Sequence, residues 1–266
     1  MTKNDKLEGE KTISRLGRID DHGKSVWVWF EDDQVYRLEG NPYNGGGRGP
    51  HMGTLATVTL LPPVCPTKII CVGRNYVAHA AEHGAEVPAE PLLFLKPPSS
   101  VIGPGMNIVL PTLSQRVEHE AELALVIGKR CRNVAPEEAW DYVLGITCGN
   151  DVTARDLQYK DGQWTRGKSF DTFCPIGPWV VTGLRSADVA DLGVVCRVNG
   201  EVRQTGRTSQ MVFSPTTLMA YAARVMTLEP GDVFLTGTPA GVGPLTPGDE
   251  VEVEIEGIGI LRNPVL

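Results

Sequence analysis

The stretch Glu118-His-Glu-Ala-Glu-Leu-Ala-Leu-Val-Ile127 joins three glutamates to an unbroken apolar run. The apolar part, residues 123–127, predicts a β-strand. Side chains alternate between the two faces of a strand, so Glu120 and Glu122 project from the same side, roughly 7 Å apart along the backbone. His119 points to the opposite face, where an ordinary surface or packed histidine is expected. The sequence therefore predicts a fold with a central β-strand that presents two acids on one face.

Two adjacent carboxylates repel each other, and burial would make their ionisation costlier still. A hard divalent cation such as Mg²⁺, Mn²⁺ or Ca²⁺ resolves both problems, because these ions favour carboxylate oxygens. The alternative is a strand end that projects into water. A third acid, Asp151, follows the candidate buried segment 144–148 and heads a polar stretch. Asp151 is either directed at the same site or caps a short helix.

A histidine and a glutamate follow the strand predicted over 68–72. Gly73 ends that strand, and a short helix after it would place His79 and Glu82, three residues apart, on one face. A carboxylate beside an imidazole fixes its tautomer and raises its basicity, as a general base requires. The alternative is a solvent-exposed pair without a catalytic role.

The segment Gly162-Gln-Trp-Thr-Arg-Gly-Lys-Ser169 matches the phosphate-loop pattern letter for letter. That loop works only between a buried strand and a helix. Here the preceding residues 153–161 are highly charged, and Pro175 would cut short a following helix. We therefore do not expect a nucleotide site, although Lys168 remains a candidate functional residue.

The 30 glycines and 20 prolines of the whole chain favour many short strands and turns over long helices. We predict a mixed β fold (α+β), a sandwich or barrel, rather than a doubly wound parallel sheet. Residues 1–65 are expected to form a small N-terminal β-rich domain with a flexible leading tail, and residues 66–266 the main domain. Further predictions are hairpins at 25–38 and 194–204, strands at 92–95, 108–110, 179–182, 233–235 and 250–256, helices at 136–143 and 215–225, and a loop at 44–50.

Composition excludes several classes of function. With 25 Lys and Arg against 32 Asp and Glu, the 266-residue chain has a net charge of −7, which argues against nucleic-acid binding. No apolar run approaches 18 residues and no secretory signal opens the chain, so no membrane association is expected. The six scattered cysteines fit a reducing compartment, and we expect a cytoplasmic protein.

Taken together, these motifs resemble the fumarylacetoacetate hydrolase (FAH) family from about residue 68 to the C-terminus. The resemblance implies an FAH-type β-sandwich or roll as the catalytic domain, a homodimer, and one Mg²⁺ or Mn²⁺ ion per subunit. The matching blocks are Lys68-Ile-Ile-Cys-Val-Gly-Arg-Asn-Tyr76, Pro91-Leu-Leu-Phe-Leu-Lys-Pro97, His119-Glu-Ala-Glu-Leu-Ala-Leu-Val-Ile-Gly128, Asn150-Asp-Val-Thr-Ala-Arg-Asp156, Lys168-Ser-Phe-Asp-Thr-Phe173, Val198-Asn-Gly-Glu201, Pro230-Gly-Asp232 and Thr236-Gly-Thr-Pro-Ala-Gly-Val-Gly243.

The resemblance also implies roles for individual residues. It assigns the metal ligands to Glu120, Glu122 and Asp151, the acids that the spacing had singled out. It assigns catalytic roles to His79 and Glu82, on a mobile lid segment, and to Lys168. It assigns substrate contacts to Arg74, Gln158 and Thr238.

The expected substrate is a small anionic 2-oxo acid. The intact His79–Glu82 pair favours a metal-dependent hydrolase that cleaves a C–C bond in an acylpyruvate such as fumarylpyruvate or acetylpyruvate, through a metal-held enolate. The same site could instead decarboxylate oxaloacetate or isomerise a 2-hydroxydiene-dioate of aromatic catabolism. A non-catalytic metal-binding protein with the same fold is the remaining alternative.

Overall fold

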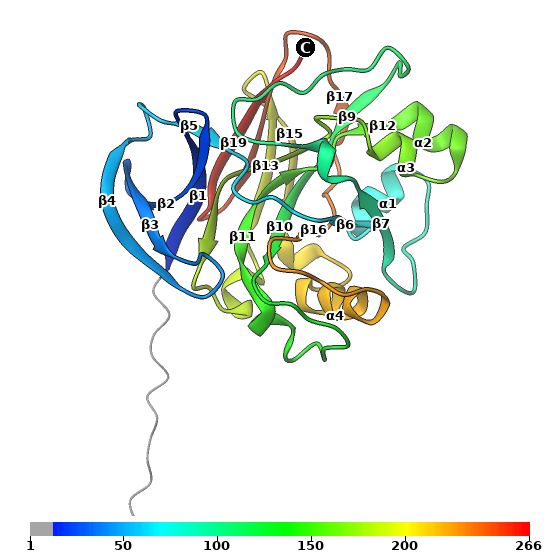
Figure 1. Ribbon diagram of the computed structural model, residues 1–266. Helices are drawn as coiled ribbons and strands as arrows, with labels where there is room; N and C mark the ends of the chain where they lie inside the picture. Colours follow the sequence, from blue (N-terminus) through cyan, green and yellow to red (C-terminus); the bar gives the residue numbers. More distant parts are fainter. Residues whose placement is uncertain (1–12) are drawn as a thin grey trace, which may run out of the picture.

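A computed structural model describes residues 13–266 (Figure 1). The predicted leading tail, residues 1–12, lies outside the described residues. Strands dominate and helices are few, so the prediction of a mixed β fold is confirmed. Among residues 13–266 no helix is long and apolar enough to cross a membrane.

A 12-stranded sheet forms the body of the molecule. Its main path runs, in spatial order, through β4 (Gly46–Thr54), β3 (Gln34–Gly40), β2 (Lys24–Glu31), β1 (Ser14–Asp21), β13 (Cys174–Thr182), β11 (Val143–Asn150), β10 (Ala121–Ile127), β16 (Val233–Leu235), β6 (Ile69–Gly73) and β7 (Leu92–Lys96). Off this path, β5 (Thr59–Leu61) pairs with β1, and β8 (Val101–Ile102) pairs with β13.

Two smaller sheets and a few short helices complete the fold. The sheets are β12 (Thr153–Ala154), β9 (Val117–His119) and β17 (Gly243–Pro244), and β15 (Glu201–Arg207), β14 (Gly193–Val198), β18 (Glu250–Ile255) and β19 (Gly259–Pro264). The helices are α1 (Val77–Glu82), α2 (Arg155–Asp161), α3 (Thr165–Lys168) and α4 (Pro215–Val225), with 3₁₀ turns η1 (Pro98–Ser100), η2 (Ala139–Tyr142), η3 (Ser186–Val189) and η4 (Thr208–Gln210).

Strand β10 lies at the centre of the core, and every residue in it is buried. It pairs with β11 on one side and β16 on the other. Leu123, Leu125 and Ile127 pack in one hydrophobic cluster, whereas Ala124 and Val126 pack in a second. Since alternate side chains face opposite sides of a strand, β10 separates two apolar layers. This burial on both faces explains why residues 123–127 are uniformly apolar.

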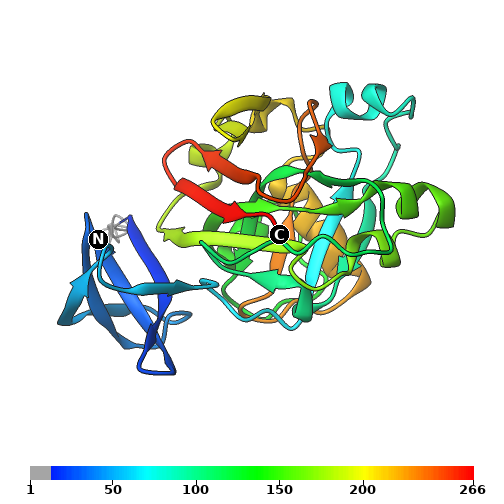
Figure 2. The ribbon, with the colours of Figure 1, turned by 90° about the horizontal axis from the view of Figure 1, so that it is seen from above.

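The N-terminal strands form a distinct group at one side of the molecule (Figure 2). Strands β1 to β4 pair with one another in sequence order, and β1 also pairs with β13, so they extend the main sheet. The rings of Phe30 and Trp179 pack across this junction at 5.4 Å between centroids. A domain boundary near residue 65 stays a prediction.

Several local predictions are confirmed. Ser214 caps α4, accepting a hydrogen bond of 3.3 Å from the backbone N–H of Thr217. Asn199 and Gly200 form the predicted hairpin turn, both with positive φ, as a two-residue turn between twisted strands requires. In β18 the apolar residues are buried, whereas Glu250 is exposed and the other two glutamates are partly exposed.

The helix predicted over 136–143 is wrong. Only η2 forms, and Val143 already begins β11. The carbonyl oxygen of Tyr142 accepts hydrogen bonds from the backbone N–H groups of Gly128 and Lys129, and Val143 pairs with Ile127 at the end of β10. A pairing with the end of β10 therefore overrides the local helical pattern.

The strand at 108–110 and the loop at 44–50 are also wrong. Residues 108–110 belong to no named strand: Ile108 makes an isolated parallel bridge to Val265, with backbone hydrogen bonds to Pro264 and Leu266. Strand β4 already begins at Gly46, because its glycines let it approach β3 closely. A Cβ at Gly46 would lie 2.8 Å from the Glu39 carbonyl oxygen, so glycine permits this strand rather than excluding it.

Gly145, in β11, marks a tight contact that positions the segment leading to Asp151. A Cβ at Gly145 would lie 2.2 Å from the Val181 carbonyl oxygen on β13. We expect Gly145→Ala to lower the free energy of unfolding by about 1–3 kcal/mol, because the neighbouring backbone must shift. Gly47→Ala is the matched control, since nothing lies within 4 Å of its Cβ position. Equal denaturation midpoints for the two variants would contradict the prediction.

Candidate active site

Three buried carboxylates meet where β10 and β11 lie side by side. One oxygen from each of Glu120, Glu122 and Asp151 lies within 4.8 Å of the other two. Glu120 lies between β9 and β10, Glu122 lies in β10, and Asp151 follows β11. The backbone N–H of Asp151 donates to the Glu120 carbonyl oxygen at 2.9 Å, which ties the two segments together. The structure thus brings together the three acids that the sequence singled out.

Both alternatives for these acids are wrong. None of the three side chains projects into water, because each residue is at most 4% exposed. Asp151 does not cap a helix, since α2 begins only at Arg155 and its N-cap residue is Ala154. His119, expected to be an ordinary surface or packed histidine, is the packed kind: it is buried, and its Nδ1 lies 2.9 Å from the Gln204 side-chain oxygen.

Buried cations surround the carboxylates. The Lys168 Nζ donates to Glu120 Oε2 at 2.8 Å and to Asp151 Oδ2 at 2.6 Å. Lys96 donates to the second oxygen of Asp151. Arg155 donates to Glu120, and also to Glu118 at 2.6 Å. Glu120 and Asp151 are therefore each paired with buried cationic side chains.

Glu122 is the exception. Its carboxylate accepts a hydrogen bond of 2.6 Å from the backbone N–H of Gly237, and it forms no ion pair among residues 13–266. Burial raises the pKa of Glu122 well above its ordinary value, and the nearby charges of Asp151 and Glu120 raise it further. For Glu120, burial acts in the same direction, but Lys168 and Arg155 outweigh it and hold its pKa well below the ordinary range.

This donor set fits a divalent metal ion. Three carboxylates offer the hard oxygen ligands that Mg²⁺ and Mn²⁺ prefer. Glu122, which lacks a cationic partner, would gain one from an ion held together with Glu120 and Asp151. The metal site that the sequence predicted is thus chemically consistent with the arrangement of the side chains.

A small cavity of about 70 Å³ opens beside the carboxylates. One water molecule needs roughly 10–15 Å³ of such space, so the cavity suits a small molecule. Asp151 and Glu82 do not line it. The predicted site residues that line it are Arg74, His79, Glu120, Glu122, Gln158, Lys168 and Thr238.

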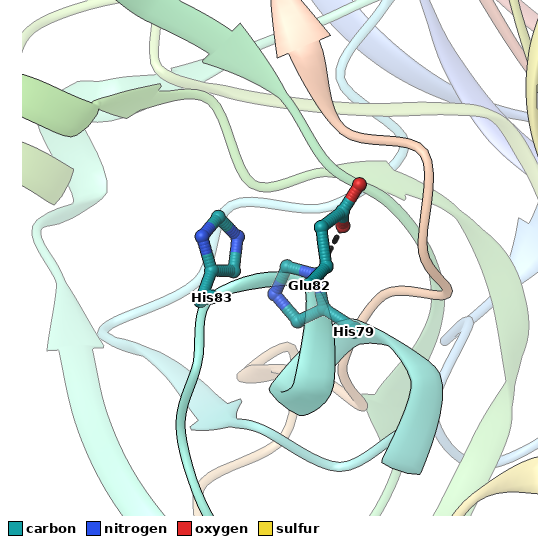
Figure 3. A group of neighbouring side chains, drawn as sticks. All are labelled: His79, Glu82 and His83. Atoms are coloured by element: carbon teal, nitrogen blue, oxygen red, sulfur yellow. Dashed lines mark hydrogen bonds and ion pairs between the residues drawn. The ribbon is translucent and has the colours of Figure 1, made fainter.

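His79 lies on α1 at the edge of this cavity, and it is 6% exposed (Figure 3). Its Nδ1 is 3.4 Å from Glu82 Oε2, and the backbone N–H of Gly241 donates to Glu82 Oε1 at 3.1 Å. Burial lowers the pKa of His79; Glu120 opposes this shift and Arg155 adds to it. His79 is therefore neutral at neutral pH and can accept a proton. The mobility of this segment stays a prediction.

The side chains of the three predicted substrate-contacting residues differ in how far they are already engaged in contacts within the protein. Arg74 is exposed at the cavity mouth, where its guanidinium carbon is 6.0 Å from the centre of the Trp164 ring. The Gln158 side-chain oxygen accepts a hydrogen bond of 2.6 Å from Arg155. The Thr238 hydroxyl donates to the Ala121 carbonyl oxygen at 2.8 Å and accepts from Gln204. Arg74 is thus the freest of the three to bind a ligand.

Sequence reasoning gave no site role to Lys96, Arg155 or His83. Lys96 and Arg155 lie inside motifs that carry the family resemblance, so position in those motifs was the available signal. Asp156, the neighbour of Arg155 in the sequence, accepts hydrogen bonds from the Ser114 hydroxyl and the backbone N–H of Gln115.

The phosphate-loop context is absent from the structure. A helix, α2, precedes the Gly162–Ser169 segment, where a nucleotide site would need a strand. The Lys168 ammonium group is directed at two carboxylates. The expectation that this segment is no nucleotide loop therefore agrees with its surroundings.

Comparison with known proteins shows the family. Residues 68–266 match the family model described as fumarylacetoacetate (FAA) hydrolase C-terminal. A mitochondrial oxaloacetate tautomerase of Xenopus laevis is 48% identical over 226 residues, which are 81% of this chain and 71% of the relative.

Two solved structures are similar over 95% of this chain. The 2-hydroxyhepta-2,4-diene-1,7-dioate isomerase of Mycobacterium marinum has 43% identity and a TM-score of 0.87, with 98% of that chain covered. The fumarylacetoacetate hydrolase of Exiguobacterium antarcticum has 39% identity and a TM-score of 0.84, with 99% covered. With this match in sequence motifs, family model and fold, the chain belongs to the fumarylacetoacetate hydrolase family.

Proposed function

We propose that this protein is a divalent-metal-dependent isomerase that moves a proton between the enol and keto forms of a small 2-oxo dicarboxylic acid. Oxaloacetate and 2-hydroxydienedioates represent the substrate class. The observation that carries the proposal is a single small cavity lined by a neutral histidine, two of the three clustered carboxylates and a buried lysine. The names of the tautomerase and isomerase relatives support this alternative better than the hydrolysis expected first.

Glu120, Glu122 and Asp151 would hold the metal ion, Mg²⁺ or Mn²⁺. When bound, such an ion supplies positive charge that polarises a 2-oxo group and lowers the energy of its enolate. Lys168 adds a fixed positive charge beside the same carboxylates, where negative charge develops on the substrate oxygen.

His79 is the proposed proton carrier. Its Nδ1 faces Glu82, so the other ring nitrogen can take a proton from carbon 3 of the keto acid while the electron pair moves toward the 2-oxo oxygen. Return of the proton to oxygen gives the enol, and the reverse sequence gives the keto acid. Arg74, exposed at the mouth, would pair with the distal carboxylate.

Cleavage of a C–C bond in an acylpyruvate is the second candidate. The observation that favours it is the pairing of His79 with Glu82, which could orient the histidine toward a water molecule. Decarboxylation of oxaloacetate would use the same cavity without that water.

The first test is a product assay with Mn²⁺ present on freshly dissolved enol-oxaloacetate, a 2-hydroxydienedioate, acetylpyruvate and fumarylpyruvate. We expect enol-to-keto conversion at least ~100-fold faster than without enzyme, the usual range for a positioned acid–base group. Ultraviolet absorbance follows the enol, and chromatography identifies the products. Cleavage of an acylpyruvate with no acceleration of any tautomerisation would make hydrolysis the function instead.

Substitution of the proposed ligands tests the metal site. Glu122→Gln and Asp151→Asn should each weaken Mn²⁺ binding by at least ~100-fold, because each removes a negatively charged ligand. Calorimetry or electron paramagnetic resonance measures the affinity. Glu137→Gln, an exposed position, is the matched control. Unchanged Mn²⁺ affinity in both site variants would show that the ion binds elsewhere.

The pH profile tests the role of His79. Only neutral His79 can accept a proton, and burial lowers its pKa below the ordinary value of 6.5. With Mn²⁺ kept saturating, kcat/KM should therefore be constant above pH 6.5 and fall at lower pH as His79 becomes protonated. The low-pH limb should disappear from the residual activity of His79→Asn and persist in His51→Asn. A limb that persists in His79→Asn would assign it to another group.

A further inference from the structure

Two histidines and a glutamate gather at the C-terminal end of α1. One ligand atom from each of His79, Glu82 and His83 lies within 4.8 Å of the other two. The two imidazole rings meet edge to face, with 4.7 Å between their centroids, and Figure 3 shows all three side chains together. No residue of this group belongs to the carboxylate cluster, although His79 and His83 line the same cavity.

His83 has a nitrogen that lacks a partner. Its Nδ1 lies 2.7 Å from the Tyr159 hydroxyl, whereas its Nε2 is buried without a hydrogen bond. An unpaired buried polar atom costs free energy unless something binds to it. Histidines that ligate metals commonly use one ring nitrogen for the ion and the other for a hydrogen bond to oxygen. Tyr159 supplies that oxygen, which leaves Nε2 for a ligand.

The spacing of His79 and Glu82 also suits a metal ion. The 3.4 Å between Nδ1 and Oε2 is long for a hydrogen bond. It is close to the roughly 3.4 Å that separates two ligands around a tetrahedral ion with bonds of about 2.0–2.1 Å. The order His79-Ala-Ala-Glu82-His83 places the histidines four residues apart, as in one class of zinc enzymes.

We propose that His79, Glu82 and His83 form a second metal site, which takes a borderline transition-metal ion such as Zn²⁺. Imidazole nitrogen suits Zn²⁺ and Co²⁺, whereas the three carboxylates suit Mg²⁺ or Mn²⁺, so the ligands separate the two classes of ion. An ion at the histidine site withdraws His79 from proton transfer and inhibits turnover. That consequence rests on the proposed function; the binding site itself does not.

The test uses the full chain, freed of metal by chelation and then saturated with Mg²⁺ to fill the carboxylate site. Co²⁺ is titrated in, and its visible absorption reports both its binding and its coordination number. We expect a Co²⁺ ion with the strong absorption of four- or five-coordination, displaced by Zn²⁺, whereas any Co²⁺ at the carboxylates would be six-coordinate and absorb weakly. Absence of this Co²⁺ spectrum in the presence of excess Mg²⁺ would overturn the proposal.

Variants identify the ligands. His83→Gln should weaken Co²⁺ binding by at least ~100-fold, and Tyr159→Phe, which removes only the partner of Nδ1, by about tenfold. His51→Gln changes an exposed histidine on β4 and should leave the affinity unchanged. Thermal unfolding verifies that each variant is folded, and Glu82→Gln, at the partly exposed ligand, replaces His83→Gln if that variant fails. Co²⁺ spectra and affinity unchanged by loss of a ligand would contradict the site.

Turnover separates this proposal from the proposed function. Each protein is assayed with and without Zn²⁺, and the ratio of the two rates is compared. We expect Zn²⁺ to inhibit the wild type by at least tenfold at concentrations that have little effect on His83→Gln. If Zn²⁺ binds the histidines without inhibiting, the site stands and the assigned role of His79 is wrong. If no ion binds the histidines, the site is wrong and the role of His79 is unaffected.

Discussion

Burial of three carboxylates at the junction of β10 and β11 is the constraint on which the rest of the site depends. Removing one partner of a buried ion pair typically costs roughly 3–5 kcal/mol, whereas apolar replacement of the whole pair is often neutral. Such a network is therefore a poor device for stability. Lys96, Arg155 and Lys168 compensate Glu120 and Asp151, and Glu122 stays without a cationic partner. The arrangement is best explained by a bound cation.

The fold supplies this cluster through ordinary strand geometry. β10 is buried on both faces, so its apolar residues hold it in the core and leave Glu122 directed at the cavity. The hydrogen bond from Asp151 to Glu120 places the third acid beside the first. Helix α1 then brings His79 to the lining of the same cavity, from a segment some forty residues earlier in the chain. The proposed metal ligands and the proposed proton carrier thus come from elements far apart in the chain.

The sequence predicted the acids because their signal is local. A period of two places Glu120 and Glu122 on one face, and a polar segment after a buried strand singled out Asp151. Lys96 and Arg155 reach the same carboxylates across 55 and 35 residues, a relation that no local pattern encodes. The helix expected over 136–143 failed for a similar reason, since Val143 pairs instead with Ile127, a residue outside the segment. Short-range rules thus predicted the site acids better than their partners.

The central claim is that Glu120, Glu122 and Asp151 together bind the catalytic divalent ion. The most direct measurement is anomalous diffraction from crystals soaked in Mn²⁺ in a solution free of Mg²⁺. We predict one strong peak at about 2.1 Å from an oxygen of each of the three carboxylates. A crystal that binds Mn²⁺ elsewhere, with no peak among these oxygens, would contradict the account.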